Sequence, residues 1–489
     1  MGQYIKVIFY NESRGQILMK VIEMLHRKLP VCVNIPHKPA RIIRLFPMLC
    51  VQAYLTFTVV LFAIGPWPWP VCNPFTLYTY LILAQLAMWF GYTLYHSHKC
   101  TIYAGRLNWE RLFNVSLVLN ILWIIPNFMC RTGVSFFDVS GIVSHIRLGL
   151  SDPGAAYTTQ IALVRGMDYS LRIITYATIL ISPLLYLLLP IGITYWTLLS
   201  PWKRALLIFW AVADVFGWVA SGTNTGLANF LFLVPIFLIV RKPDIIAKFK
   251  LVRVLIILCI TILGFYAFLA FFSLGMQTRS GSPSLTGSDS SIGIRYNDSN
   301  FVLSAVPKSM RGGVASFCSY LTQGYYGLSL CLNEPFTWSY GLGHSYYLTS
   351  WYKKIDPNAD IYLLSYPGRV SVFNNWDYFG RWHSIYSWIA SDVTFPGTIV
   401  VMFLLARLFA KVWLDILWCR NPIATALLAI LVTIFVYVPA NNPVFGGAPS
   451  SAAFWILLVW WLKTRRTLPH RVIPGRVGRP VRTRAVNLA

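Results

Sequence analysis

The chain has 489 residues, of which 56% are hydrophobic and 12% charged, and its mean hydropathy is +0.59. A composition this apolar excludes an ordinary soluble protein, because so much hydrophobic surface has to be covered by lipid. The formal net charge of +25 would suit nucleic acid, but the Lys and Arg residues are dispersed between apolar segments. We therefore predict an all-α polytopic membrane protein with no nucleic-acid partner.

Residues 1–42 form a basic N-terminal segment that lacks the charged-then-apolar pattern of a cleaved signal peptide. Within it, residues 15–29 place apolar side chains at helical spacing beside Lys20, Arg27 and Lys28. This pattern is typical of a helix that lies on an anionic membrane surface. We expect this segment to be cytoplasmic.

Apolar segments long enough to cross a bilayer, which takes about 20 residues, recur along the chain. They lie near residues 43–64, 72–95, 112–130, 172–199, 205–221, 226–240, 251–274, 385–409, 422–439 and 450–462. About ten spans are therefore predicted, seven in a membrane domain at 43–274 and three at 385–462.

Basic residues mark one end of these spans. Lys and Arg gather in alternate connections and in the Arg-rich tail at 463–489, whereas the connections at 65–70, 221–225 and 441–449 carry neither. Because cytoplasmic connections are enriched in positive charge, both termini are predicted to be cytoplasmic. The connection at 131–170 and the large insertion at 275–384 then lie on the outer side.

Both outer segments have internal patterns. The connection at 131–170 has the apolar periodicity of a short interfacial helix. The insertion begins with a Ser- and Gly-rich stretch, continues with one helix or paired helices over 306–331, and becomes aromatic and, we expect, loop-rich from Pro335 onward. Its cysteines, Cys318 and Cys331, are compatible with either a disulfide or two free thiols.

Charged and aromatic residues of these outer segments are candidates for binding sugars and anions. Rings such as Trp376 and Tyr378 suit sugar faces, although a dense aromatic cluster also suits a membrane interface. Arginine binds phosphate oxygens bidentately, although the same residues would also anchor loops to lipid phosphates. Within the spans, Asp214 is either functional or paired near a helix end. The candidate arginines are Arg147, Arg165, Arg295, Arg311, Arg369 and Arg381.

The most informative stretch is Arg381-Trp382-His383-Ser384, followed by Asp392 and by Gly397 inside an apolar run. This arrangement resembles the histidine, acidic residue and membrane glycine of Wzy-type O-antigen polymerases and O-antigen ligases. These families are similar in plan, with basic cytoplasmic connections and one large outer loop before the motif. The resemblance implies a GT-C-like fold.

The resemblance also implies roles for individual residues. His383, with Asp377 or Asp392, would activate the acceptor hydroxyl, and Arg369 followed by Gly380 matches a spacing in polymerase outer loops. The chain departs from the family at 222–226, where Gly-Thr-Asn-Thr-Gly stands in place of a Ser-Arg-Gly turn. Arg147 or Arg165 would have to substitute for the missing arginine.

The implied reaction is transfer of a glycan from a polyprenyl pyrophosphate to an acceptor hydroxyl. It needs fixed positive charge at the leaving group and a base at the hydroxyl, tasks that suit arginine and histidine. No Asp-x-Asp pair occurs, so we expect neither a metal nor another cofactor. The resemblance implies a bacterial inner-membrane location, lipid-linked donor and acceptor, membrane lipids and a chain-length regulator as partners.

Three alternatives to a polymerase stay open. A ligase would use the same site. The polymerase is favoured because polymerases are the more divergent group and the motif in this chain matches only loosely. A flippase or other transporter would place polar residues along the spans and keep its loops short. A glycoside hydrolase would need two carboxylates about the scissile bond, for which Asp360, Asp377 and Asp392 are present.

Overall fold

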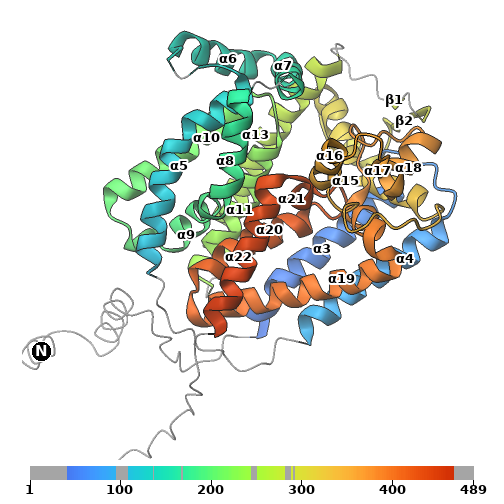
Figure 1. Cartoon of the computed structure of the whole chain (residues 1–489). Coiled ribbons are helices and arrows are strands. Elements are labelled where there is room, and N and C mark those ends of the chain that lie inside the picture. The colour runs from blue at the N-terminus through green and yellow to red at the C-terminus, as the bar shows by residue number, and fades with distance from the viewer. Residues whose placement is uncertain are drawn as a thin grey trace, which may run out of the picture.

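The computed structural model describes residues 41–94, 108–135, 137–166, 169–243, 251–280, 288–289 and 292–466. Over these residues the chain is a bundle of helices with one small antiparallel sheet, formed by β1 (Ser288–Asp289) and β2 (Ile294–Arg295) (Figure 1). The predicted all-α class is confirmed. The surface helix expected over 15–29 and most of the basic tail lie outside the described residues.

A helix occupies each of the predicted apolar segments. These helices are α3 (Arg41–Ile64), α4 (Pro74–Thr93), α5 (Trp109–Thr132), α8 (Tyr169–Leu185) with α9 (Leu188–Thr194), α10 (Pro201–Ala220), α11 (Thr225–Arg241), α13 (Leu251–Ser280), α19 (Ser384–Cys419), α20 (Pro422–Val436) and α22 (Ala448–Arg466). Among the described residues, three helical stretches are long and apolar enough to cross a membrane: Arg41–Ile64, Trp109–Thr132 and Leu171–Thr194. By length and composition these three stretches support association with a membrane, and the figure of about ten crossings stays a prediction.

Local chemistry explains where several helices begin and end. The side chain of Asn108 accepts hydrogen bonds from the backbone N–H groups of Glu110 and Arg111, which caps the start of α5. That helix ends at Gly133, whose φ of 76° is left-handed and suits glycine. Asn421 caps α20 in the same way, and Pro422 fills its first position, where a missing N–H costs nothing.

Helix α19 packs against both α4 and α20. Helix α20 is apolar and buried on nearly all sides, as expected of a helix surrounded by others. At Gly91, α4 approaches α19 so closely that a Cβ atom would lie 2.2 Å from the carbonyl oxygen of Phe403. Glycine is therefore required where these two backbones meet.

The two segments predicted to lie on the outer side contain more helix than expected. The connection at 131–170 holds two helices, α6 (Val139–Ser151) and α7 (Pro153–Arg165), which lie together at one end of the bundle (Figure 1). The insertion holds α14 (Phe301–Ser304) and α15 (Lys308–Cys331), and then α16 (Tyr346–Ile355), α17 (Ile361–Leu364) and α18 (Tyr366–Phe373). Over 306–331, where one helix or paired helices were expected, the structure has the single helix α15. The expectation of loop from Pro335 onward was wrong in part, because capped short helices order this region.

The cysteines of the insertion are free thiols. Cys318 and Cys331 are both buried and lie on the same helix, α15. Thirteen residues of α-helix separate them by about 20 Å, far beyond the reach of a disulfide. Of the two alternatives, the structure therefore selects the free thiols.

Asp214 has partners within the bundle. Its carboxylate lies 3.1 Å from the guanidinium of Arg131 on α5 and accepts a hydrogen bond of 2.9 Å from the indole of Trp218. The Arg131 guanidinium in turn lies 3.7 Å from the centre of the Trp218 ring. This arrangement favours the paired, structural alternative for Asp214, which ties α10 to α5.

Candidate functional site

A pocket of about 290 Å³ lies where the insertion meets the start of α19. Its walls come from the first turn of α16, from the loop before α19, from α19 itself and from α21 (Pro443–Gly446) with its flanks. We call it the aromatic pocket. Its lining residues are Tyr346, Tyr378, Phe379, Trp388, Asn441, Asn442, Pro443, Gly446 and Gly447.

The aromatic pocket combines flat rings with amide groups. The indole N–H of Trp388 donates to the side-chain oxygen of Asn441 across 2.5 Å, and the Tyr378 ring packs against Trp388 at 5.1 Å between centroids. Tyr346 contacts Phe379 edge to face at 5.4 Å. Rings offer apolar faces to sugars while asparagine offers both a donor and an acceptor, so this lining suits a polar, ring-shaped ligand.

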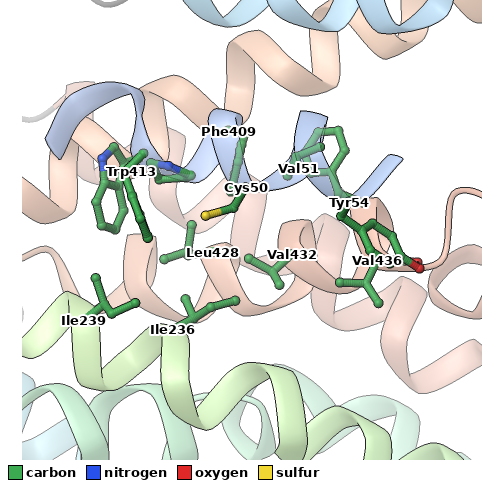
Figure 2. A pocket seen from close by; sticks show the side chains of 13 residues that line it. Cys50, Val51, Tyr54, Ile236, Ile239, Phe409, Trp413, Leu428, Val432 and Val436 are labelled. Atoms are coloured by element: carbon green, nitrogen blue, oxygen red, sulfur yellow. The ribbon is translucent and has the colours of Figure 1, made fainter. Parts of the chain in front are cut away.

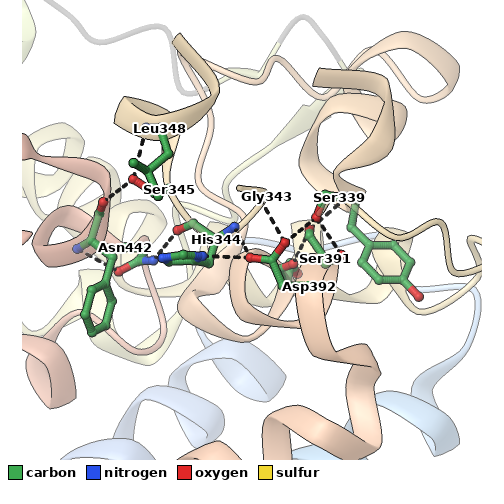
Figure 3. A network of polar contacts seen from close by, with 11 residues as sticks. Ser339, Gly343, His344, Ser345, Leu348, Ser391, Asp392 and Asn442 are labelled. Carbon is green, nitrogen blue, oxygen red and sulfur yellow. Dashed lines mark hydrogen bonds and ion pairs between the residues drawn. The ribbon is translucent and has the colours of Figure 1, made fainter. Parts of the chain in front are cut away.

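A histidine–aspartate pair belongs to the polar network of Figure 3, which also contains the pocket residue Asn442. The Nδ1 atom of His344 lies 2.7 Å from the carboxylate of Asp392 on α19. The same carboxylate accepts hydrogen bonds from the hydroxyl of Ser339 and from the backbone N–H groups of Gly343 and His344, at 2.5, 3.0 and 2.8 Å. Asp392 is therefore held on several sides by the segment 339–344.

Contacts on the far side of His344 join this pair to the pocket. The side-chain amide of Asn442 donates to the backbone carbonyl of His344 across 2.8 Å, and the His344 ring contacts Phe445. Asn442 also lines the aromatic pocket. Asp392 was predicted from the sequence but His344 was not, because the two lie 48 residues apart and nothing in the local pattern of His344 indicates a partner.

His383, the predicted base, is completely buried, with 0% exposure. Its Nε2 lies 3.3 Å from the backbone carbonyl of Asp377, and its Nδ1 has no hydrogen-bond partner among the described residues. Burial lowers the pKa of His383 to about 4, because a charged ring would lose its hydration. Its ring contacts Trp388, so His383 lies behind the wall of the aromatic pocket.

Asp377 is exposed and binds its own turn. Its carboxylate accepts hydrogen bonds from the backbone N–H groups of Phe379 and Gly380, at 3.2 and 2.8 Å. Asp377 meets His383 through its backbone carbonyl. The carboxylate therefore fixes the loop that carries Tyr378 and Phe379 into the pocket.

Of the predicted aromatic pair, Tyr378 lines the pocket and Trp376 does not. Trp376 is fully buried, donates its indole N–H to the carbonyl of Trp382 across 3.0 Å, and packs against Tyr326. The guanidinium of Arg381 lies 5.1 Å from the centre of the Trp376 ring. Trp376 thus supports Arg381 and the turn before α19 from within the core.

Arg369 is buried and bound by the protein itself. Its guanidinium donates to the carbonyls of Leu363, Leu364 and Pro335, at 3.1, 2.8 and 2.8 Å, and lies over the Tyr366 ring. These bonds hold the segment before α16 against α17 and α18. The geometry of Arg369 is that of a residue that orders the insertion.

The remaining predicted arginines lie away from the lining of the aromatic pocket. Arg147 is exposed on α6, and Arg165 is the last residue of α7. Arg295 is exposed on β2, and Arg311, in the first turns of α15, lies 3.8 Å from Asp298. The structure does not bring these four together at the pocket.

A second cavity, of about 240 Å³, lies inside the bundle and is almost wholly apolar. Figure 2 shows side chains of α3, α11, α19 and α20 around it, among them Cys50, Ile236, Phe409 and Val432. Val436, the last residue of α20, lines this cavity and precedes Asn441 of the aromatic pocket by five positions. An apolar cavity of this kind suits a hydrocarbon chain.

Among the described residues, no three His, Cys, Asp or Glu side chains gather in a way that would hold a metal ion. No protein-family model, no curated protein and no solved structure matches this chain.

Proposed function

We propose that the chain polymerises polyprenyl-pyrophosphate-linked oligosaccharide repeat units into a surface polysaccharide, on the outer face of a bacterial inner membrane. The observation that carries this proposal is the aromatic pocket. Four aromatic rings and two asparagine amides enclose a space at the end of an apolar helix, beside a histidine–aspartate pair. Sugar binding at a membrane surface is the function that this combination fits best.

The apolar cavity supports a lipid-linked substrate. It lies within the helical bundle, and its lining carries almost no polar surface. A polyprenyl chain needs such a path, because its hydrocarbon gains free energy from each methylene taken out of water. The cavity and the aromatic pocket share helices α19 and α20 or their ends, so one substrate would use both.

The pyrophosphate needs positive charge near the transferred sugar. Arg381 follows the pocket residues Tyr378 and Phe379 by three and two positions and lies over the Trp376 ring. We assign Arg381 to the pyrophosphate. Arg295, Arg311, Arg147 and Arg165 lie away from the lining of the aromatic pocket and are given no role in this step. Arg369 contributes by ordering the insertion. A metal-independent glycosyl transfer would rely on the positive charge of Arg381 to stabilise the departing pyrophosphate.

The test is to delete the gene in its own host and to display surface polysaccharide and lipid-linked precursors on a gel. Loss of long chains, with single repeat units still attached to their lipid acceptor, is expected for a polymerase. Restoration by the wild-type gene but not by Arg381→Ala, at equal protein levels, would support the assignment of Arg381. Arg407→Ala, a change far along α19 from its first turn, is the matched control.

Other outcomes separate the alternatives. An undecorated acceptor in the deletion strain would indicate a ligase, because no glycan is then attached at all. Precursors that accumulate on the cytoplasmic side would indicate a flippase. An unchanged polysaccharide pattern would contradict the proposal.

A further inference from the structure

The His344–Asp392 pair has the geometry of an oriented base beside the aromatic pocket. We infer that His344 takes the proton from the acceptor hydroxyl during transfer and that Asp392 is its positioning residue. This inference rests on the glycosyl transfer proposed above. It replaces His383, the histidine that the family resemblance implies, with a residue outside the family motif.

The hydrogen bonds around Asp392 fix the state of the His344 ring. A carboxylate accepts hydrogen bonds, so the 2.7 Å contact from Nδ1 places the proton of the neutral ring on Nδ1. The lone pair is then on Nε2, which has the character of a base. The bonds from Ser339, Gly343 and the His344 backbone keep the carboxylate from turning away.

His344 is accessible where His383 is not. Its side chain is 27% exposed, whereas His383 is 0% exposed. A ring that is sealed inside the protein cannot accept a proton directly from a sugar hydroxyl. Access therefore distinguishes the two histidines.

Three residues of the aromatic pocket flank the pair. Tyr346 follows His344 by two positions, and Asn442 donates to the His344 carbonyl. Trp388 precedes Asp392 by four positions on α19, so the two side chains lie one turn apart on the same helix face. An acceptor sugar in the pocket would thus lie next to the pair.

The reaction step balances without a co-reactant. The O–H bond of the acceptor breaks, its proton passes to Nε2 of His344, and its oxygen bonds to the anomeric carbon of the donor sugar. The bond between that carbon and the pyrophosphate oxygen breaks, and its electron pair leaves with the polyprenyl pyrophosphate. The imidazolium, stabilised by the negative charge of Asp392, then releases the proton to water.

A purely structural role of the pair makes a different prediction. Asp392 anchors the segment 339–344 through the backbone N–H groups of Gly343 and His344 and the Ser339 hydroxyl. That anchoring does not require the imidazole. His344→Gln should therefore be nearly silent if anchoring is the whole role.

The experiment uses the full-length protein in liposomes, with lipid-linked repeat units purified from the host as donor and acceptor, and measures polymer formation against pH. His344→Gln is expected to lower kcat by about 10²–10⁴-fold with a KM within a few-fold of wild type. Asp392→Asn is also expected to lower kcat, because an amide group that donates to Nδ1 would place the ring proton on Nε2, where the base is needed. His145→Gln, a change on α6, is the matched control and should leave the profile unchanged.

The outcomes separate the two proposals. Absence of polymer with the wild-type protein would contradict the proposed function. Polymer formation at an unaltered rate in His344→Gln would contradict the role of His344 alone. If His344→Gln does not accumulate, Asp392→Asn decides, and an unaltered kcat in that variant overturns the inference.

Discussion

The indole N–H of Trp388 donates a 2.5 Å hydrogen bond to the side-chain oxygen of Asn441, and this bond joins α19 to the connection between α20 and α22. Both residues line the aromatic pocket. The bond fixes the plane of the Trp388 ring, so the ring is oriented before a ligand arrives. An oriented ring loses less conformational entropy when a sugar stacks on it.

Replacing Trp388 should therefore weaken substrate binding. Trp388→Leu removes the ring face, and a loss of about 1.4 kcal/mol, or roughly tenfold in KM for lipid-linked repeat units, is expected. The KM is measured from the rate of polymer formation in liposomes. Trp202→Leu is the control, because Trp202 is exposed in the first turn of α10. Equal KM values for the two variants would contradict a sugar-binding role for the pocket.

The ion pair between Asp214 and Arg131 should stabilise the bundle. Asp214→Ala leaves the Arg131 charge without its carboxylate partner, and Arg131→Ala leaves the Asp214 charge without its cation. Each of these two single changes is expected to lower the free energy of unfolding by about 3–5 kcal/mol. The double variant should lose less than the sum of the two, because it removes the charge that either single change strands. Thermal unfolding in detergent micelles measures all three. Strict additivity would show that the two side chains do not interact.

Thr394 interrupts α19 with a left-handed backbone, at φ 68° and ψ 167°, three residues before Gly397. This combination of φ and ψ is essentially restricted to glycine and costs other residues about 1–3 kcal/mol. Thr394→Gly should therefore raise the midpoint of thermal unfolding. Thr433→Gly is the matched control in a regular part of α20, and there the midpoint should fall, since glycine weakens a helix interior by about 1 kcal/mol. A lower midpoint for Thr394→Gly would contradict strain at this position.

His383 should make stability depend on pH. Its pKa is lowered from 6.5 to about 4 by burial, so the unfolded chain binds a proton more readily than the folded chain. Stability is therefore highest above pH 6.5 and falls as the pH drops from there toward 4, by roughly 3 kcal/mol in all.

The comparison of unfolding midpoints for wild type and His383→Gln, from pH 8 to pH 5, measures this contribution. The glutamine variant does not titrate, so its midpoint should fall less steeply with acid than that of wild type. Parallel curves would mean that His383 titrates alike in the folded and the unfolded chain.

The amino-acid sequence by itself determined the helical class and the position of every apolar helix. Hydropathy and helix propensity act over neighbouring residues, so each apolar segment could be located without knowledge of the others. The sequence also indicated the region of the site, because Tyr378 and Asp392 flank the start of α19. It underestimated the order after Pro335, where short capped helices such as α16 and α18 are held by tertiary contacts.

Only the tertiary structure decided which side chains meet. It paired Asp392 with His344 across 48 residues, enclosed His383 behind Trp388, and brought Asn441 and Asn442 into the pocket from a connection whose one visible feature was its lack of Lys and Arg. It also turned Arg369 inward onto three carbonyls. The physical reason is that burial and hydrogen bonding between distant segments depend on how helices pack, and local pattern carries no record of that packing.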